Sequence, residues 1–308
     1  MNRVSTPSGI IATLSADEVH RRLASFNTKR FAPALPESNW RDDLCAFVDG
    51  ATLEGEFLEG ECERVRARAS RVPVDPDGFV AWFEELQQTG PGQNDPLFPW
   101  LAKSASMAEM KWFLTQEIAG EAGFEDLTAL TQVRFPTRPK LELARNYWDE
   151  MGRGKPKGMH GPLLEHLAVS LGLEPQVKTT VWESLALANT MAGLAANRRY
   201  AYHSIGALGV IELTAPRRAI AVATGLKRLG VPAGDRHYFD LHSILDVKHS
   251  FGWNAEAIHP LVAENPKVAP AIAEGALMRL ECGRRCFDRY RRELGVQPEL
   301  RPEAALSG

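Results

Sequence analysis

Cysteine is scarce in this sequence. The 308 residues include four cysteines, Cys45, Cys62, Cys282 and Cys286, too few for a disulfide framework in a chain of this length. Cys282 and Cys286 are four residues apart, which does not match the CxxC spacing of zinc and redox sites. We therefore expect free thiols in a reducing, cytoplasmic environment.

Long apolar runs and a strong net charge are also absent. No run approaches the ~18 uninterrupted apolar residues of a transmembrane helix, and the N-terminal residues lack the apolar core of a secretory signal. The formal net charge of −3 at pH 7 gives no electrostatic footprint for nucleic acid. The sequence therefore predicts a protein without membrane or nucleic-acid partners, whose ligand is a small molecule. A homodimer is compatible with it.

Alternating β-branched runs are nearly absent as well, and helical periodicity takes their place. Segments such as DGFVAWFEELQQ and RRAIAVATGLKRLG repeat apolar residues at intervals of three and four, so we predict an all-α fold. Prolines and the loop TGPGQNDP interrupt the first part of the chain. We expect residues 1–95 to form a helical extension packed on a core of residues 96–294, followed by a tail of residues 295–308.

The stretch DRHYFDLHSILDVKHSFGW carries the clearest chemical pattern. Its His242, Asp246 and His249 stand at i, i+4 and i+7, which places their side chains within roughly 60° of one another on an α-helix. Two imidazoles and a carboxylate on one stripe suit a metal with mixed nitrogen and oxygen ligands. The alternative is a solvated helix face.

A second signal is an isolated acid. Glu212 is the only charged residue between Arg199 and Arg217, counting His203 as neutral, in a segment that is apolar nearly all round. Burying such a carboxylate is costly unless it is paired, protonated or bound to a metal. We therefore predict a ligand or catalytic role for Glu212.

Glu150 and His160 flank a turn-forming run, GRGKPKG. Glu150 ends one predicted helix and His160 begins the next, so the two side chains should lie close together. Arg145 is expected to pair with Asp149 on the first of these helices. A phosphate-binding loop is the alternative, but the run lacks the GxxxxGK[ST] pattern.

A fourth acid comes from an earlier helix, expected to begin at Pro99 or Ser104. Glu117 and Glu121 lie one turn apart on the same face of it, and apolar neighbours draw that face inward. Either glutamate satisfies the pattern.

Together these positions supply four carboxylates and three imidazoles. Four negative charges match the charge of two ferrous ions, which makes a buried cluster of acids affordable. Manganese suits the same donors, whereas zinc is less suited to so many oxygens. The predicted metal ligands are Glu117, Glu150, His160, Glu212, His242, Asp246 and His249.

The order of these motifs resembles that of the haem-oxygenase-like diiron oxidases and oxygenases, also described as iron-containing redox enzymes. The resemblance covers roughly Leu97 to Leu294 and rests on FLTQEIAGE, Glu-x9-His, GALGVIELTAP and His-x3-Asp-x2-His. It favours Glu117 over Glu121, because Glu117 follows the aromatic-Leu run as in the family. It implies seven helices around a cavity without haem, two Fe ions bound by the residues above, and O2 activation at the diferrous state.

The resemblance also implies a choice of reactions. Relatives oxygenate nitrogen in amines or amino-acid-derived substrates, or cleave C–C or C–H bonds of fatty or amino acids. We favour N-oxygenation of an amine or nitrogen heterocycle in a biosynthetic pathway, with an external electron donor compatible with that chemistry. The other hypotheses are a metal-free helical enzyme and a non-catalytic binding protein.

Two related folds fit less well. Haem oxygenase would need a proximal histidine where this chain has a glutamate. A ferritin-like bundle needs two Glu-x-x-His motifs, and this sequence has one candidate, Glu256 to His259.

Substrate-contacting residues are less defined by the sequence. Candidates for the cavity wall are Tyr147, Trp148, Tyr202 and His203. Candidates for binding a substrate carboxylate are Arg198, Arg199, Arg217 and Arg218.

Overall fold

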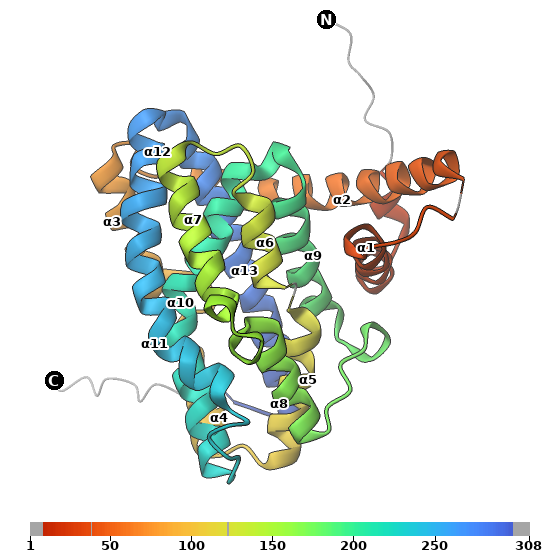
Figure 1. Ribbon diagram of the computed structural model, residues 1–308, viewed down its shortest axis with the longest axis vertical. Coiled ribbons are helices and arrows are strands. Elements are labelled where there is room, and N and C mark those ends of the chain that lie inside the picture. The colour runs from red at the N-terminus through yellow and green to blue at the C-terminus, as the bar shows by residue number, and fades with distance from the viewer. Residues whose placement is uncertain (1–8, 38, 122, 298–308) are drawn as a thin grey trace, which may run out of the picture.

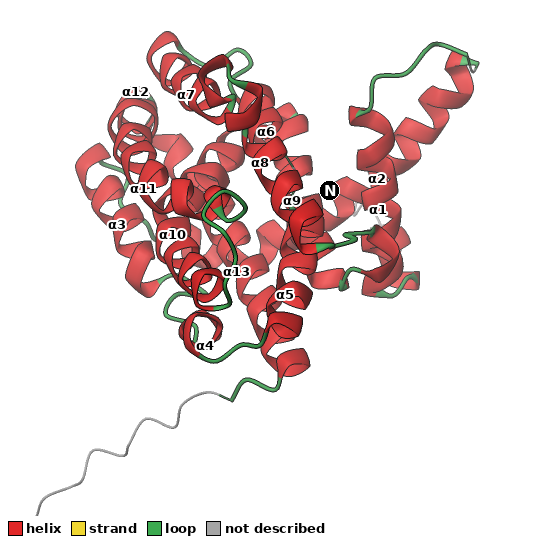
Figure 2. Ribbon diagram, turned by 60° about the horizontal axis from the view of Figure 1, so that its bottom comes forward, coloured by secondary structure: helices red, strands yellow, loops and turns green. Residues whose placement is uncertain are grey.

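Helices account for the regular structure in residues 9–37, 39–121 and 123–297, the parts of the chain that the computed structural model describes (Figures 1 and 2). The all-α prediction is confirmed there. Except for residues 295–297, the predicted tail lies outside these ranges. The α-helices are α1 (Ala16–Phe31), α2 (Trp40–Ala69), α3 (Pro76–Thr89), α4 (Leu97–Lys103), α5 (Met107–Gly120), α6 (Phe124–Thr131), α7 (Thr137–Glu150), α8 (His160–Leu171), α9 (Trp182–Ala196), α10 (Ala201–Arg228), α11 (His237–Gly252), α12 (His259–Glu264) and α13 (Ala269–Leu294).

Helix α10 is the central element of the bundle. It packs on α13 and α11 over much of its length and also contacts α3, α4 and α9. Two glycines let α10 and α13 approach closely. A Cβ atom on Gly206 would overlap the backbone of Ile272, and one on Gly275 would overlap the backbone of His203. Glycine is required at both positions because any side chain would force the two helices apart.

Helix α11 continues through a π-helical segment, η6 (Trp253–Ile258), into α12. The Trp253 side chain is fully buried, and its indole N–H donates to the carbonyl oxygen of Ile205 at 3.1 Å. Gly209 of α10 leaves room for the ring, since a Cβ atom there would collide with it. This contact anchors the end of α11 against α10, and π-helical segments of this kind are frequent at functional sites.

The first three helices pack on the rest of the molecule. Helix α1 lies against α9, α2 lies against α13, and α3 contacts α10 and α12; Figures 1 and 2 show α1 and α2 at one side of the bundle. Buried His20 of α1 stacks on Trp182 with a centroid separation of 5.7 Å. The proposed domain boundary at residue 95 stays a prediction. Within the described ranges, no helix has both the length and the hydropathy needed to cross a bilayer.

The glycine contact predicts a large stability effect. Gly206→Ala should lower the free energy of unfolding by at least about 3 kcal/mol, because the new methyl group meets backbone atoms of α13. Gly60→Ala is the matched control at an exposed, unobstructed position of α2, and should stabilise the protein by about 0.5–1 kcal/mol. Urea unfolding measures both. Equal effects of the two substitutions would contradict the close contact.

His20 predicts a pH-dependent stability. Its burial, with a further contribution from Arg285, lowers the pKa from 6.5 to about 4. The unfolded chain therefore takes up a proton at a higher pH than the folded chain. The stability contribution is complete above pH 6.5 and is lost as the pH falls to about 4, a loss of about 3 kcal/mol.

The control is His20→Phe, which keeps a ring against Trp182. Between pH 7 and pH 4, the unfolding free energy of the wild type should fall by about 3 kcal/mol more than that of the variant. An identical fall in both proteins would show that His20 is not the titrating group.

Candidate metal centre

A tight loop brings the last residue of α7 and the first residue of α8 together. The backbone between them has positive φ at Gly152, Arg153 and Gly154, and a Cβ atom on Gly152 would overlap the chain at residue 158. The loop thereby folds back on itself. Glu150 Oε2 lies 2.8 Å from His160 Nδ1, so the expected proximity of these residues is confirmed.

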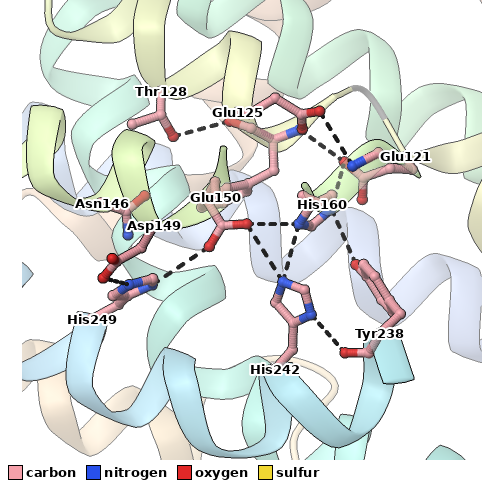
Figure 3. Close-up of polar contacts among 12 residues, drawn as sticks. Glu121, Glu125, Thr128, Asn146, Asp149, Glu150, His160, Tyr238, His242 and His249 are labelled. Atoms are coloured by element: carbon pink, nitrogen blue, oxygen red, sulfur yellow. Dashed lines mark hydrogen bonds and ion pairs between the residues drawn. The ribbon is translucent and has the colours of Figure 1, made fainter. Parts of the chain in front are cut away.

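The stripe on α11 faces the same two residues. His242, Asp246 and His249 are all buried, although α11 carries Ile244 and Phe251 on its exposed side. His242 Nε2 lies 3.1 Å from His160 Nδ1 and 3.5 Å from Glu150 Oε2 (Figure 3). The solvated-face alternative for this stripe is therefore wrong.

Each of the three imidazoles has one nitrogen directed into the cluster and the other bound outside it. His242 Nδ1 lies 2.7 Å from the carbonyl oxygen of Tyr238, and His160 Nε2 lies 3.2 Å from the hydroxyl of the same tyrosine. His249 Nε2 lies 3.2 Å from Asp149 Oδ2. Outer partners of this kind fix the orientation of a metal-binding imidazole and its tautomer.

Glu212 enters the cluster from α10. Its carboxylate is buried, accepts a hydrogen bond from Asn146 Nδ2 at 2.5 Å, and lies 3.5 Å from His249 Nδ1. Pro216 follows one turn later and lacks the N–H that would bond to the Glu212 carbonyl. The Gln87 side chain donates to the next carbonyl, that of Leu213, at 2.9 Å.

The earlier helix differs from the expectation. Helix α5 begins after Ser106, which forms a capping box with Glu109, and not at Pro99 or Ser104. It ends at Gly120, so the prediction that Glu117 and Glu121 share a helix face is wrong.

The two glutamates consequently have different surroundings. Glu121 has an extended backbone, and its Oε1 lies 3.8 Å from His160 Nε2. Glu117 accepts a hydrogen bond from the Tyr290 hydroxyl at 2.9 Å. Both line the cavity described below. Which of them binds a metal stays a prediction.

The electrostatics of the cluster favour bound positive charge. Burial and the neighbouring carboxylates Glu212 and Glu150 raise the pKa of Asp246 well above its usual range. Burial opposes the charged form of His249, but Glu212, Glu150 and Asp149 outweigh it and raise the pKa to about 9. Burial likewise opposes ionisation of Glu150, yet bonds from His160 and His242 lower its pKa. Without a metal, the cluster therefore retains protons that a cation would displace.

The donor set fits divalent metal ions. Glu150, His160 and His242 form one group with ligand atoms within 4.8 Å of one another, and Glu150, Asp246 and His249 form a second. Asp246 Oδ1 and His249 Nδ1 are buried without a hydrogen-bond partner among the described residues. Both groups share Glu150, so this carboxylate would help to hold a metal ion in either group.

A cavity of about 150 Å³ adjoins this cluster. Acidic ligand candidates, aromatic rings and two arginines line it. One of these arginines, Arg218, is among the four predicted as candidates for binding a substrate carboxylate. Tyr147, Trp148, Tyr202 and His203 were expected in its wall and are absent from it. Tyr202 packs on Phe135, for example, and His203 bonds to Glu274 at 2.8 Å.

Several residues near the cluster were not predicted from the sequence. Asp149 bonds to His249 and Arg153, whereas Arg145 pairs with Glu142, so the expected Arg145–Asp149 pair is wrong. Tyr238 was detectable, because it stands four residues before His242 on the same stripe. Asn146 and Arg279 have no comparable signal.

Solved structures with a similar chain trace define the fold class. A CADD-like protein of unknown function from Nostoc punctiforme PCC 73102 is 18% identical, with a TM-score of 0.54 over 71% of this chain and 97% of that chain. A domain of unknown function with a heme oxygenase-like fold from Shewanella denitrificans OS217 is 15% identical, with a TM-score of 0.50 over 70% of this chain and 90% of that chain. The protein thus has a haem-oxygenase-like fold with a buried carboxylate–imidazole cluster.

The sequence match is more specific than the fold. Residues 111–284, more than half of the chain, match the model of the iron-containing redox enzymes, and the chain belongs to that family. No curated protein matches the sequence. Family membership supports a coarse oxidoreductase role, and the buried Glu/His cluster is compatible with iron.

The effect of Asp246→Asn on stability should differ between the metal-free and the iron-loaded protein. In metal-free protein, burial and the neighbouring carboxylates raise the pKa of Asp246 and favour its neutral form, so the neutral amide should change stability by less than about 1 kcal/mol. In iron-loaded protein, a tenfold loss of affinity removes about 1.4 kcal/mol of stabilisation. Calorimetry with and without ferrous iron under anaerobic conditions measures both.

Asp240→Asn is the matched control for Asp246→Asn. Asp240 lies on the same helix, but it pairs with Arg236 at 3.1 Å and is partly exposed. It should leave the iron-dependent rise in Tm intact. Loss of that rise in the control alone would place the metal elsewhere.

Proposed function

We propose that the protein is a non-haem diiron oxygenase or oxidase that uses O2 to oxidise a small molecule. The observation that carries the proposal is the inward orientation of three imidazole nitrogens around the shared carboxylate of Glu150. The proposed ligands are Glu121, Glu150, His160, Glu212, His242, Asp246 and His249.

The ligands divide into two sets. Glu150, His160 and His242 belong to one ion, and Asp246, His249 and the Glu212 carboxylate to the other, with Glu150 between them. Glu121 replaces the predicted Glu117 as our choice for the first glutamate because its carboxylate lies 3.8 Å from the outer nitrogen of the His160 ring, whereas Glu117 is bonded to Tyr290 of α13. Glu121 Oε1 also accepts a hydrogen bond from the Phe124 N–H at 3.1 Å. Four carboxylates then balance two divalent ions. Manganese would satisfy the same ligands and is the alternative metal.

Bound iron would supply the electrons and coordination positions that O2 chemistry requires. The chain itself orients the site. Tyr238 and Asp149 hold the imidazoles, and Arg153 holds Asp149 at 2.6 Å. Phe98, Phe124 and Phe239 give the adjoining cavity an apolar wall.

For the reaction, our first hypothesis is N-oxygenation of an amine or nitrogen heterocycle, with electrons from an external donor. Oxidative C–C or C–H cleavage of an acid is the second hypothesis. It gains support from Arg218, a basic residue that lines the same cavity as the proposed ligands. Cytoplasmic location and a homodimer remain parts of the proposal.

The assignment of the first glutamate predicts a difference between two variants. Glu121→Gln should lower the iron content from two ions per chain towards one, because it removes a charged ligand. Glu117→Gln should retain both ions. Metal analysis of anaerobically reconstituted protein gives the iron content, and an oxygen electrode follows O2 consumption by the reduced protein.

Two results would contradict the proposal. Wild-type protein that consumes O2 fully without metal would remove the metal centre from the reaction. Loss of iron in Glu117→Gln with full loading of Glu121→Gln would return the ligand role to Glu117.

A further inference from the structure

Two arginines that no metal requires line the cavity. Arg218 comes from α10 and Arg279 from α13, and both are half-buried residues of the cavity wall. Arg218 lies six residues after Glu212, which places it about 9 Å further along the helix axis. A ligand between this arginine and the metal cluster would therefore span a few bonds.

Neither arginine forms an ion pair with any described residue, and Arg279 Nε is buried without a hydrogen-bond partner. Four other arginines also have a buried Nε without a hydrogen-bond partner, but each of them forms an ion pair with a carboxylate, three through a terminal nitrogen and Arg236 through Nε itself. These pairs are Arg30–Glu54, Arg236–Asp240, Arg285–Glu61 and Arg289–Glu293. Arg279 is the exception in this group.

The two guanidinium groups also act on each other. Burial lowers the pKa of Arg218 to about 10, and the charge of Arg279 contributes to the shift. Arginine side chains keep their charge in proteins, so two cations face the same cavity. Such an arrangement is costly unless an anion joins it.

Glu117 supplies only part of the counter-charge. Burial raises its pKa, against opposing effects of the Tyr290 hydroxyl and the two arginines. A single carboxylate offsets at most one of the two arginine charges, so at least one positive charge remains.

The net charge of the whole cavity also leaves one positive charge. Five carboxylates line it, namely Glu117, Glu121, Glu150, Glu212 and Asp246. Two arginines and two divalent ions contribute six positive charges, which leaves a net charge of +1. The result is the same whether Glu117 or Glu121 is the metal ligand.

The position of Arg218 and the volume of the inner cavity restrict the ligand further. Arg218 and Phe98 also line a second hollow of about 300 Å³, which is bordered by the exposed residues Asn94, Pro99 and Arg217. Arg218 thus stands between the surface hollow and the metal cluster. The inner cavity of about 150 Å³ is the size of an apolar cavity that holds benzene, and aromatic rings form much of its wall.

We propose that Arg218 and Arg279 bind the carboxylate of the substrate. The substrate is then a small carboxylic acid with a neutral, largely apolar remainder, and its reacting end points towards the metal cluster. This substrate class favours the second hypothesis for the reaction, oxidation of an acid, over oxygenation of an amine. Guanidinium groups suit this role because their N–H groups match carboxylate geometry. The inference rests on the proposed function for the metal charge, but the two arginines are tested separately from it.

The first test uses three probes of one shape and different charge: benzoate, benzamide and benzamidine. Calorimetric titration into iron-reconstituted anaerobic wild-type protein should give benzoate binding at least about tenfold tighter than benzamide, with benzamidine weakest. Benzoate that binds no more tightly than benzamide, including the case in which neither binds, overturns the proposal. So does tightest binding of benzamidine.

The second test locates the anion. Arg218→Gln and Arg279→Gln should each weaken benzoate binding at least about tenfold and leave benzamide unchanged. Arg217→Gln is the matched control, because Arg217 is exposed and bonds to Gln88 at 3.0 Å. It should bind benzoate as the wild type does. If benzoate bound directly to the metal instead, both cavity variants would retain their affinity, which overturns the proposal.

Iron content separates this inference from the proposed function. Each variant should carry as much iron as the wild type, as measured on the titrated sample. Protein without iron contradicts the proposed function, whereas iron-loaded protein without charge preference contradicts the arginine site. If a glutamine variant does not fold, Arg218→Lys and Arg279→Lys take its place and should retain the preference for benzoate.

Discussion

Five carboxylates surround one small cavity in the interior of a helical bundle, and the free-energy cost of burying them constrains the rest of the structure. An ionised carboxylate in such surroundings must have a nearby positive charge or must take up a proton. The three imidazoles of the cluster and the two arginines are the groups that can supply this positive charge, and they come from different helices. The raised pKa values of Asp246 and His249 are the direct expression of this demand in the metal-free chain.

The packing of α10 explains why these charges can converge. This helix carries Glu212 and Arg218 and lies so close to α13 that Gly206 and Gly275 cannot carry side chains. The contact between Trp253 and Ile205 then sets the end of α11 against the same helix. Glu212, the α11 stripe and the two arginines therefore occupy helices held close together by these contacts, which fixes their positions more rigidly than a loop would.

Local pattern was sufficient for much of the site. The periodic stripe of α11, the isolated charge of Glu212 and the loop between Glu150 and His160 are all readable from neighbouring residues, and the structure brings them together. The position of Glu121 was not readable, because it depends on where α5 ends. Arg279 was missed because α13 is rich in arginine, and only its tertiary contacts distinguish this one from its ion-paired neighbours.

The surroundings of Glu117 connect the metal cluster with the arginines. Its carboxylate accepts a hydrogen bond from Tyr290, whose hydroxyl lies 2.8 Å from Ser184 Oγ, so this acid is held in place from α13 and α9. Fixed there, it offsets part of the repulsion between Arg218 and Arg279 before any ligand arrives. Without this acid, the two arginines would repel each other more strongly. A second acid of this kind would leave no positive charge for a substrate. A single fixed carboxylate is therefore the arrangement that keeps the pair stable and still receptive to one anion.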